Sequence, residues 1–380
     1  MKDMQQLIRL RHELHRHPEL SGSEKQTALR IRAYVDRFNP DHVVTDIGGE
    51  GLAFIFDGKN DGPTVLLRCE LDALPIQEMN NVDYRSQVDG IAHLCGHDGH
   101  MAVMAGVAER IAEKRPAAGK VVLLYQPAEE TGQGASLVVD DPLFKKLKPD
   151  WVFALHNIPG YPKNTILIRE GPFASASVGI EVRLTGKTSH AGEPEKGINP
   201  ARAVADIITS LTDMPAPKHL FKEMVLATIV HINLGSIAYG TSAGYAEIRA
   251  TLRAYLDEDL KQMQEMAKEF ISRSAKQYQL GHTIEFVEYF PAVINSPDAT
   301  RIIREVAKEN NLTVAEPEMP FRWSEDFSHF INAAKGAMFG LGAGEDTPQL
   351  HNPDYNFPDE IIRSGVKAFS SIVYKILGSI

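Results

Sequence analysis

Four short apolar runs each lead into polar, chemically reactive residues, and this repeated pattern constrains the fold more than any other feature. The runs are residues 64–69, 121–125, 151–155 and 337–341, and the polar residues after them include Glu70, Asp72, Glu129, Glu130, His156 and His351. Such runs are typical of strands that are buried on both faces of a parallel sheet. In these sheets ligands bind beyond the carboxyl ends of the strands. The sequence therefore predicts an α/β domain with a ligand site along one sheet edge.

Residues 93–100 concentrate metal-binding chemistry. They contain Cys95, three histidines and one aspartate, interrupted by two glycines. Cys95 and His97 are too close in sequence to share a helical face, so we expect both on a loop that glycine allows to fold around an ion. A structural zinc site normally uses paired cysteines, whereas this chain has only Cys69 and Cys95. The pattern therefore predicts a catalytic metal site.

Length and charge agree with a globular enzyme. The chain has 380 residues, of which 43% are hydrophobic, and this exceeds the usual size of one core, so two domains are expected. The net charge of -10, without any block of lysine or arginine, argues against nucleic acid or an anionic membrane as a partner. No apolar run is long enough to span a bilayer, and the charged first residues are unlike a signal peptide. Two cysteines fit a reducing compartment, so we expect a cytoplasmic protein.

The chain is predicted to hold one domain inserted into another. Strand and helix patterns alternate to about residue 175, as expected for a mostly parallel sheet sandwiched by helices. They then follow the order β-α-β-β-α-β, at residues 178–184, 200–211, 224–233, 245–255, 257–278 and 283–289. This is the order of a split-βαβ, ferredoxin-like α+β domain. We therefore predict a first domain at residues 1–176 and 291–380, and an inserted domain at residues 177–290.

Seven motifs, in order along nearly the whole chain, resemble those of one enzyme family. They are Arg11-His12-Glu13-Leu14-His15-Arg16-His17-Pro18-Glu19-Leu20, Leu71-Asp72-Ala73-Leu74-Pro75, Cys95-Gly96-His97-Asp98-Gly99-His100, Pro127-Ala128-Glu129-Glu130, Leu155-His156-Asn157, Ser324-Glu325-Asp326-Phe327 and Leu350-His351-Asn352-Pro353. The chain resembles the aminoacylase/carboxypeptidase family of dinuclear metallohydrolases. More narrowly, it is similar to the amidohydrolase branch, which includes hippurate hydrolase, N-acyl-amino-acid amidohydrolases and plant auxin-conjugate hydrolases. The resemblance implies a zinc-peptidase-like catalytic domain with an inserted dimerisation and lid domain.

The resemblance also implies a centre with two divalent metal ions per subunit. The branch's general base is matched by Glu129, and its metal ligands by Cys95, His97, Glu130, His156 and His351. Two ions roughly 3.5–4 Å apart would lower the pKa of a bridging water toward ~7. The base would take its proton and return it to the leaving nitrogen. A thiolate with three imidazoles suits zinc, while carboxylate and water positions also admit manganese or cobalt.

His190 of the predicted inserted domain also matches a catalytic residue. In the family this histidine donates to the developing oxyanion, often across a dimer interface, so the resemblance implies a homodimer formed through the inserted domain. Small residues flank His190 in Ser189-His190-Ala191-Gly192, which suits an approach to substrate. No ligand candidate lies within residues 177–290, so catalysis is expected to require closure of the two domains. The alternative is a histidine that only caps or ends a strand.

Several other residues have simpler structural interpretations. His12 and His15 lie on a predicted amphipathic helix and are expected to be packing or capping groups. Cys69 is expected to be a small buried hydrophobic residue.

Residues that flank the motifs admit two interpretations. His93 and His100 are either hydrogen-bonding partners of the ligands or core histidines. Glu325 and Asp326 are either ordinary loop carboxylates or, by the resemblance, supports of the site. A glutamate pair after a strand is, taken alone, usually solvated surface, and only its context favours catalysis.

The sequence leaves the substrate open. Many family members carry Asn-Val-Ile-Pro in the inserted domain, where the asparagine helps to bind the substrate carboxylate, and here Gly240-Thr241-Ser242-Ala243-Gly244 occupies that place. Arg249 and Arg253 on one predicted strand, or Arg322, could bind a carboxylate, although a strand arginine is as often a surface residue.

We therefore expect a metal-dependent amidohydrolase that cleaves the amide of a small N-acyl amino acid or a related peptide-like conjugate. One competing hypothesis is a dipeptidase or carboxypeptidase with the same metals and base. Another is a non-catalytic binding protein on the same fold. The intact ligand set with Glu129 argues against the last.

Overall fold

The computed structural model describes residues 4–379, which form two compact units. One unit is built from the chain up to Phe173, from Val293–Met319 and from Asp326 onward. The other consists of Ala174–Ala292 and Pro320–Glu325. The return segment Pro320–Glu325 was not predicted to belong there, and it is held by backbone hydrogen bonds to Ser175. Each unit has its own apolar core.

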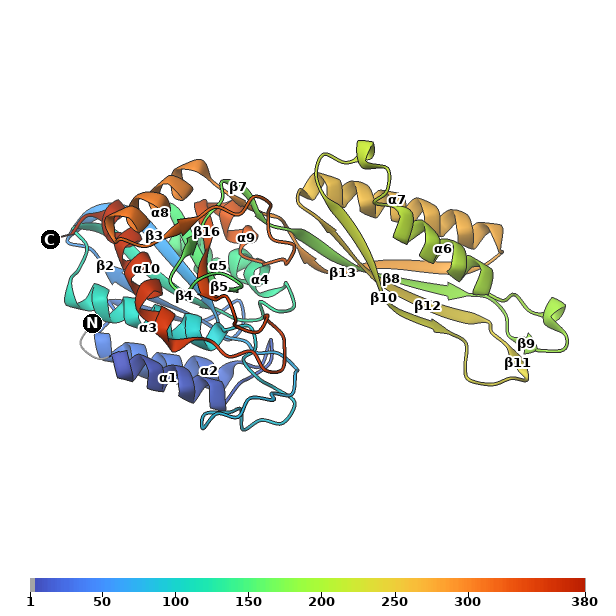
Figure 1. The fold of residues 1–380 in the computed structure, drawn as a ribbon, viewed down its shortest axis with the longest axis horizontal. Coiled ribbons are helices and arrows are strands. Elements are labelled where there is room, and N and C mark those ends of the chain that lie inside the picture. Colours follow the sequence, from blue (N-terminus) through green and yellow to red (C-terminus); the bar gives the residue numbers. More distant parts are fainter. Residues whose placement is uncertain (1–3, 380) are drawn as a thin grey trace. The chain divides into compact units, whose positions relative to one another are not determined.

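An eight-stranded sheet forms the centre of the first unit (Figure 1). In spatial order its strands are β1 (His42–Ile47), β2 (Gly51–Asp57), β4 (Ala118–Gln126), β3 (Asn60–Glu70), β5 (Trp151–Pro159), β16 (Lys335–Gly344), β6 (Ile166–Leu167) and β15 (Val314–Ala315). The central strands β4, β3, β5 and β16 are parallel. Each contains one of the four apolar runs, so these strand predictions are confirmed. A separate pair joins β7 (Gly171–Ala174) to β14 (Val293–Asn295).

Helices cover both faces of this sheet. One face shares its apolar core with α1 (Met4–Arg16), α2 (Lys25–Val35), α3 (His97–Glu113), α8 (Pro297–Glu309) and α10 (Ile362–Leu377). The other face carries α4 (Gly134–Asp140), α5 (Pro142–Leu147) and α9 (Ser328–Ala333). The predicted sandwich of a mostly parallel sheet between helices is confirmed. None of the helices in residues 4–379 combines the length and apolar composition needed to cross a membrane.

The second unit is a four-stranded antiparallel sheet with two helices on one face (Figure 1). Its elements in chain order are β8 (Ala176–Thr185), α6 (Ala201–Asp213), β10 (Val225–Leu234), β12 (Tyr245–Ala254), α7 (Asp257–Gln277) and β13 (Gly281–Phe290), and their spatial order is β10-β12-β8-β13. Val178, Ile180, Val182 and Leu184 point to the helix side, because alternate residues of a strand face the same way. The predicted β-α-β-β-α-β order is confirmed. A small pair, β9 (Ser189–His190) with β11 (Thr241–Ser242), extends from this sheet.

Candidate metal centre

The five candidate ligands lie close together at the carboxyl edge of the parallel strands. They are His156 in β5, Glu130 after β4, His351 after β16, and Cys95 and His97 where the chain enters α3. Because β4, β3, β5 and β16 are neighbours in the sheet, their ends bring together residues that are far apart in sequence. The first unit therefore assembles the whole predicted ligand set in one cluster.

Two of these residues sit on different elements from those predicted. The loop position expected for His97 is wrong, because Gly96 adopts a left-handed backbone (φ 96°) that lets α3 begin directly at His97. His156 lies inside β5 rather than after it, since Gly340 of β16 pairs with it and β5 continues to Pro159. Cys95 does lie on a loop, as expected.

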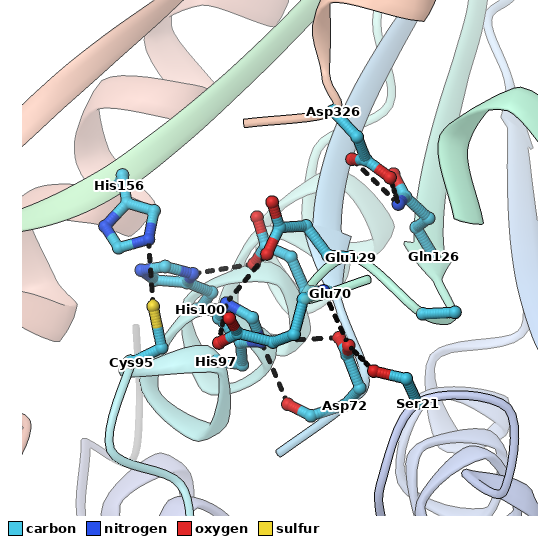
Figure 2. A network of polar contacts seen from close by, with 12 residues as sticks. Ser21, Glu70, Asp72, Cys95, His97, His100, Gln126, Glu129, His156 and Asp326 are labelled. Carbon is cyan, nitrogen blue, oxygen red and sulfur yellow. Dashed lines mark hydrogen bonds and ion pairs between the residues drawn. The ribbon is translucent and has the colours of Figure 1, made fainter. Parts of the chain in front are cut away.

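Cys95 and His156 face each other across the cluster (Figure 2). The Sγ of Cys95 lies 3.4 Å from Nε2 of His156. Nδ1 of His156 donates to the backbone carbonyl of Asn157 at 2.9 Å, and Nδ1 of His97 donates to that of Asp72 at 2.9 Å. When neutral, both rings therefore carry their proton on Nδ1 and present the Nε2 lone pair to the cluster. This arrangement is typical of metal-binding histidines.

The carboxylate of Glu130 lies between two histidines. Its Oε1 is 3.9 Å from Nε2 of His97, and its Oε2 is 3.6 Å from Nε2 of His351. The five candidate ligands form two groups in which all ligand atoms lie within 4.8 Å of one another: Cys95 with His97 and His156, and Cys95 with Glu130 and His351. Two groups that share one thiol have the form expected of a centre for two ions.

The donor atoms of this cluster fit divalent cations. Nε2 of His97 is buried and has no hydrogen-bond partner among the described residues. Burial, reinforced by the charge of His100, holds the pKa of His156 well below its usual range, so this ring is neutral and able to coordinate. A thiol, imidazoles and a carboxylate in one buried place suit zinc and related metals.

Glu129 stands beside the same cluster. Its side chain is buried, and its Oε2 lies 3.9 Å from Nε2 of His97. Glu129 and Glu130 thus direct their carboxylates to the same histidine, while Glu130 also faces His351. This geometry allows one carboxylate to coordinate an ion and the other to accept a proton.

Asp72 makes hydrogen bonds to three separate segments of the chain, and Figure 2 shows the bond from Ser21. Its Oδ2 accepts hydrogen bonds from the Ser21 hydroxyl at 2.7 Å and from the Glu130 backbone N–H at 2.9 Å. Burial raises the pKa of Asp72, but hydrogen bonds from His97, Glu130 and Ser21 outweigh this and lower the pKa below its ordinary value. The sequence placed Asp72 at the sheet edge, and the structure shows that it orients one candidate ligand and anchors the peptide of another.

His100 lies directly behind the candidate ligands. Its Nδ1 is 2.7 Å from Oε2 of Glu70, its Nε2 is 2.5 Å from Oδ1 of Asn157, and its ring packs edge-on against His156 at 4.9 Å between centroids. His100 therefore packs against one candidate ligand, while its side-chain hydrogen bonds go to Glu70 and Asn157 rather than to a ligand.

A buried ion-pair network surrounds Arg68 and was not predicted from the sequence. Arg68 pairs with Glu70 and, at 2.7 Å, with Asp326, which also accepts from the Gln126 amide at 2.8 Å. All four side chains are buried, and a buried charge without a partner is strongly destabilising. The only signal in the sequence was an arginine inside an apolar run. Asp326 therefore supports the strand ends from which Glu70 and the glutamate loop emerge.

The histidines of α1 are structural, as predicted. His15 is buried between Asp98 at 2.8 Å and Glu78 at 3.1 Å, and His12 pairs with Asp359 at 2.9 Å.

Cys69 and His93 belong to the core of the first unit. Burial raises the pKa of the Cys69 thiol well above its usual value, so Cys69 is a buried apolar group as predicted. His93 is also buried, and its ring nitrogens have no hydrogen-bond partner among residues 4–379.

His190 lies in the second unit, at the end of β9. It is exposed and pairs with Thr241 of β11. Its Nδ1 accepts a hydrogen bond from the Gly192 backbone N–H at 3.0 Å. The neutral ring therefore carries its proton on Nε2, where it is available as a donor.

The arginines of β12 differ in their partners. Arg249 pairs with Glu247 at 2.5 Å and with Glu181 at 3.0 Å, so its charge is already matched. One Nη of Arg253 donates to the Arg322 carbonyl at 3.0 Å and to the Ser324 hydroxyl at 2.9 Å. Arg253 has no carboxylate partner among the described residues, and burial lowers its pKa. Of the two arginines of β12, Arg253 is the one whose surroundings suit an incoming anion.

Binding of a divalent cation is expected to expel a proton from His97. Burial lowers the pKa of His97, but the hydrogen bond to Asp72 and the charges of Glu70 and Glu130 outweigh it and raise the pKa to about 10 in the metal-free protein. The ring is therefore protonated below about pH 10, and a cation must displace that proton. Metal affinity should rise roughly tenfold per pH unit between about pH 7 and about pH 9 for this one proton. Calorimetric titration with zinc in buffers of different ionisation enthalpy measures the proton that is released. A zinc affinity that does not change with pH would contradict the prediction.

Comparisons with known proteins agree with this geometry. The N-acetylcysteine deacetylase of Bacillus subtilis is 28% identical over 376 residues, which cover 98% of this chain and 97% of that protein. The N-acetyldiaminopimelate deacetylase of Lactobacillus helveticus is 28% identical over 98% of both chains. The crystal structure of the B. subtilis YXEP protein, described as a dinuclear metal binding peptidase from the M20 family, has a TM-score of 0.83 and 26% identity over 99% of both chains.

A family model covers most of the chain. The model described as "Peptidase family M20/M25/M40" matches residues 66–375, a span that holds all five candidate ligands and Glu129. The motif-based resemblance to dinuclear metallohydrolases is confirmed, and the chain belongs to peptidase family M20/M25/M40.

Proposed function

We propose that this M20-family hydrolase cleaves the amide bond of a small N-acyl amino acid with the help of two divalent metal ions. The observation that carries the proposal is the glutamate pair, in which Glu130 faces His97 and His351 while Glu129 stands beside His97. The relatives named as deacetylases of N-acetylated amino acids favour the same bond type.

The ligands would be Cys95, His97, Glu130, His156 and His351. When bound there, zinc, manganese or cobalt would polarise the substrate carbonyl and acidify a water molecule. Asn157 and Asp72 carbonyls hold the rings of His156 and His97 in the tautomer that coordination needs.

Glu129 is the general base in this proposal. Its carboxylate takes a proton from the attacking water and delivers it to the nitrogen of the leaving amino acid. Its burial removes competing bulk water and strengthens its charge interactions. Glu130 cannot serve equally well, because its two oxygens are directed to histidines on either side.

A free carboxylate on the substrate is the next element of the proposal. Arg253 is a partly buried cation whose hydrogen bonds in the described chain go only to neutral oxygens. Such a group is stabilised by a bound anion, and guanidinium binds carboxylate in a two-pronged geometry. An N-acyl amino acid or a peptide supplies that carboxylate.

We further propose a homodimer formed through the inserted domain. β10 is an edge strand of the second unit, and it exposes Val230, Ile232 and Leu234. An edge strand with exposed apolar side chains favours pairing with another strand, and β10 of a second subunit would pair with this edge.

Replacement of His190 by alanine is expected to lower turnover ~100- to 1,000-fold with metal content unchanged. The reason is that Nε2 of His190 carries a proton and can donate to the oxyanion that forms on the substrate carbonyl. Steady-state kinetics beside elemental analysis measure both quantities. Unchanged turnover would remove His190 from the mechanism. If the donation crosses a dimer, mixing His190→Ala with Glu129→Gln protein should restore part of the activity.

The substrate class is tested with a panel of N-acetyl amino acids, N-benzoyl amino acids and dipeptides offered to metal-loaded protein. The proposal predicts hydrolysis of N-acyl amino acids in preference to dipeptides. Preference for dipeptides would favour the dipeptidase or carboxypeptidase alternative. Binding without turnover of any compound would favour a non-catalytic binding protein.

A further inference from the structure

The backbone directly before the glutamate pair is held in an uncommon conformation. Ala128 has a φ of 53°, in the left-handed region that residues with a side chain rarely adopt. Its N–H donates to Oε1 of Glu24 at 2.7 Å, and its carbonyl accepts from the Gly134 N–H at 3.0 Å. Such strained residues persist only where their surroundings fix them. The Glu24 side chain therefore supplies one of the bonds that fix the turn leading into Glu129.

Glu24 is turned away from its own helix. It is the N-cap residue of α2, a position from which a side-chain oxygen can accept a hydrogen bond from the first turn. Its side chain makes no such bond. Instead, Oε2 of Glu19 accepts from the Thr27 N–H at 2.7 Å and from the Thr27 hydroxyl at 2.9 Å. Because Glu19 satisfies the start of α2, Glu24 is available to bind Ala128.

The Glu24 carboxyl is buried at a cost to the fold. Its Oε1 also accepts from the Gly22 N–H at 2.9 Å, whereas its buried Oε2 has no hydrogen-bond partner in the described chain. Burial raises the pKa of Glu24 above its ordinary value. A buried carboxyl with one unsatisfied oxygen destabilises the fold. The favourable contribution of Glu24 therefore lies in its two hydrogen bonds from the backbone N–H groups of Gly22 and Ala128.

The same short segment reaches the candidate ligands by a second route. The hydroxyl of Ser21 donates to Asp72 (Figure 2). The Asp72 carboxylate in turn accepts the backbone N–H of Glu130. Residues 21–24 thus contact the glutamate loop both before Glu129 and, through Asp72, at Glu130.

We propose that Glu24 is a positioning residue for the glutamate loop, acting through the backbone of Ala128 to place the carboxylates of Glu129 and Glu130. It contacts neither substrate nor metal. The inference rests on the proposed function for the roles of the two glutamates. Its effect on Glu130 would nevertheless be visible in metal affinity without any substrate.

Four variants test this role. Glu24→Ala removes both backbone contacts, and Glu24→Asp shortens the side chain so that it cannot reach Ala128 fully. Glu24→Gln keeps an oxygen that can accept the Ala128 N–H. Glu19→Ala is the matched control, because it removes a carboxylate from the same segment and weakens α2 without touching Ala128. Each full-length protein is titrated with Co²⁺ by absorbance, and its kcat, KM and thermal unfolding are measured.

Glu24→Ala and Glu24→Asp are expected to bind Co²⁺ ~10- to 100-fold more weakly and to lose kcat by a similar factor, with an altered Co²⁺ spectrum. Glu24→Gln should be close to wild type, and Glu19→Ala should unfold at lower temperature with normal Co²⁺ affinity and kcat. If Glu24→Ala does not fold, Glu24→Asp decides. Wild-type Co²⁺ affinity and kcat in the Glu24 variants would overturn the proposal, as would equal losses in Glu19→Ala or no rescue by Glu24→Gln. Weakened Co²⁺ binding in a protein that hydrolyses no N-acyl amino acid would refute the proposed function while supporting the role of Glu24.

Discussion

Glu129→Gln is expected to lower turnover by at least ~100-fold while the protein keeps its full metal content. Glutamine has nearly the same shape as glutamate but cannot take a proton from water. Because the Glu129 carboxylate lies 3.9 Å from His97 and belongs to neither of the two groups formed by the five candidate ligands, the metal ions should remain bound. Steady-state kinetics and elemental analysis of the same sample separate the two effects.

Glu130→Gln is the matched control for that experiment. It changes the neighbouring residue by the same atom, yet Glu130 lies between His97 and His351 as a candidate ligand. Loss of its charge should lower metal affinity first and activity as a consequence, so added metal should recover part of the turnover. Near-normal turnover in Glu129→Gln, or loss of metal in that variant alone, would reverse the roles assigned to the pair.

Cys95→Ala and His97→Ala are expected to lose metal and nearly all activity. Cys95 belongs to both groups of candidate ligands, and Nε2 of His97 is buried with no hydrogen-bond partner in the described chain. Removal of either atom leaves at least one ion short of a ligand. Elemental analysis after dialysis measures the bound metal.

Cys69→Ala provides the control for the cysteine variant. Cys69 is equally buried, but its thiol packs in the apolar core and its raised pKa disfavours the thiolate that a metal would need. This variant should keep its metal and lose only some stability. Undiminished metal in both Cys95→Ala and His97→Ala would rule out the ligand assignment.

The sequence predicted those elements whose local pattern and tertiary setting agree. The continuous apolar runs of β4 and β5 could be recognised because strands buried on both faces need no polar positions. The alternation in β8 likewise indicated one face toward helices and one away. The start of α3 was mistaken for a loop, because Cys95 and His97 are too close in sequence to share a helical face; in the structure only His97 is helical, and Cys95 precedes the helix.

The supporting groups of the site could not be predicted from local pattern. Arg68 of β3 and Asp326 in the turn before α9 are far apart in sequence, and only the tertiary fold brings them together. Glu24 carries no signal in the sequence, and only the structure shows that Glu19 binds Thr27 while Glu24 binds Ala128. In contrast, the ligands could be named, because a resemblance in seven motifs carries residue identities that periodicity alone does not.

The proposed function depends most on a metal centre that drives hydrolysis at the edge of the parallel strands. The most direct measurement is a titration of metal-free protein with zinc, manganese or cobalt, in which bound metal and hydrolysis of an N-acyl amino acid are followed together. The proposed function predicts no turnover without metal and a rise in turnover that is complete when two ions per subunit are bound. Undiminished hydrolysis by the metal-free protein would contradict it.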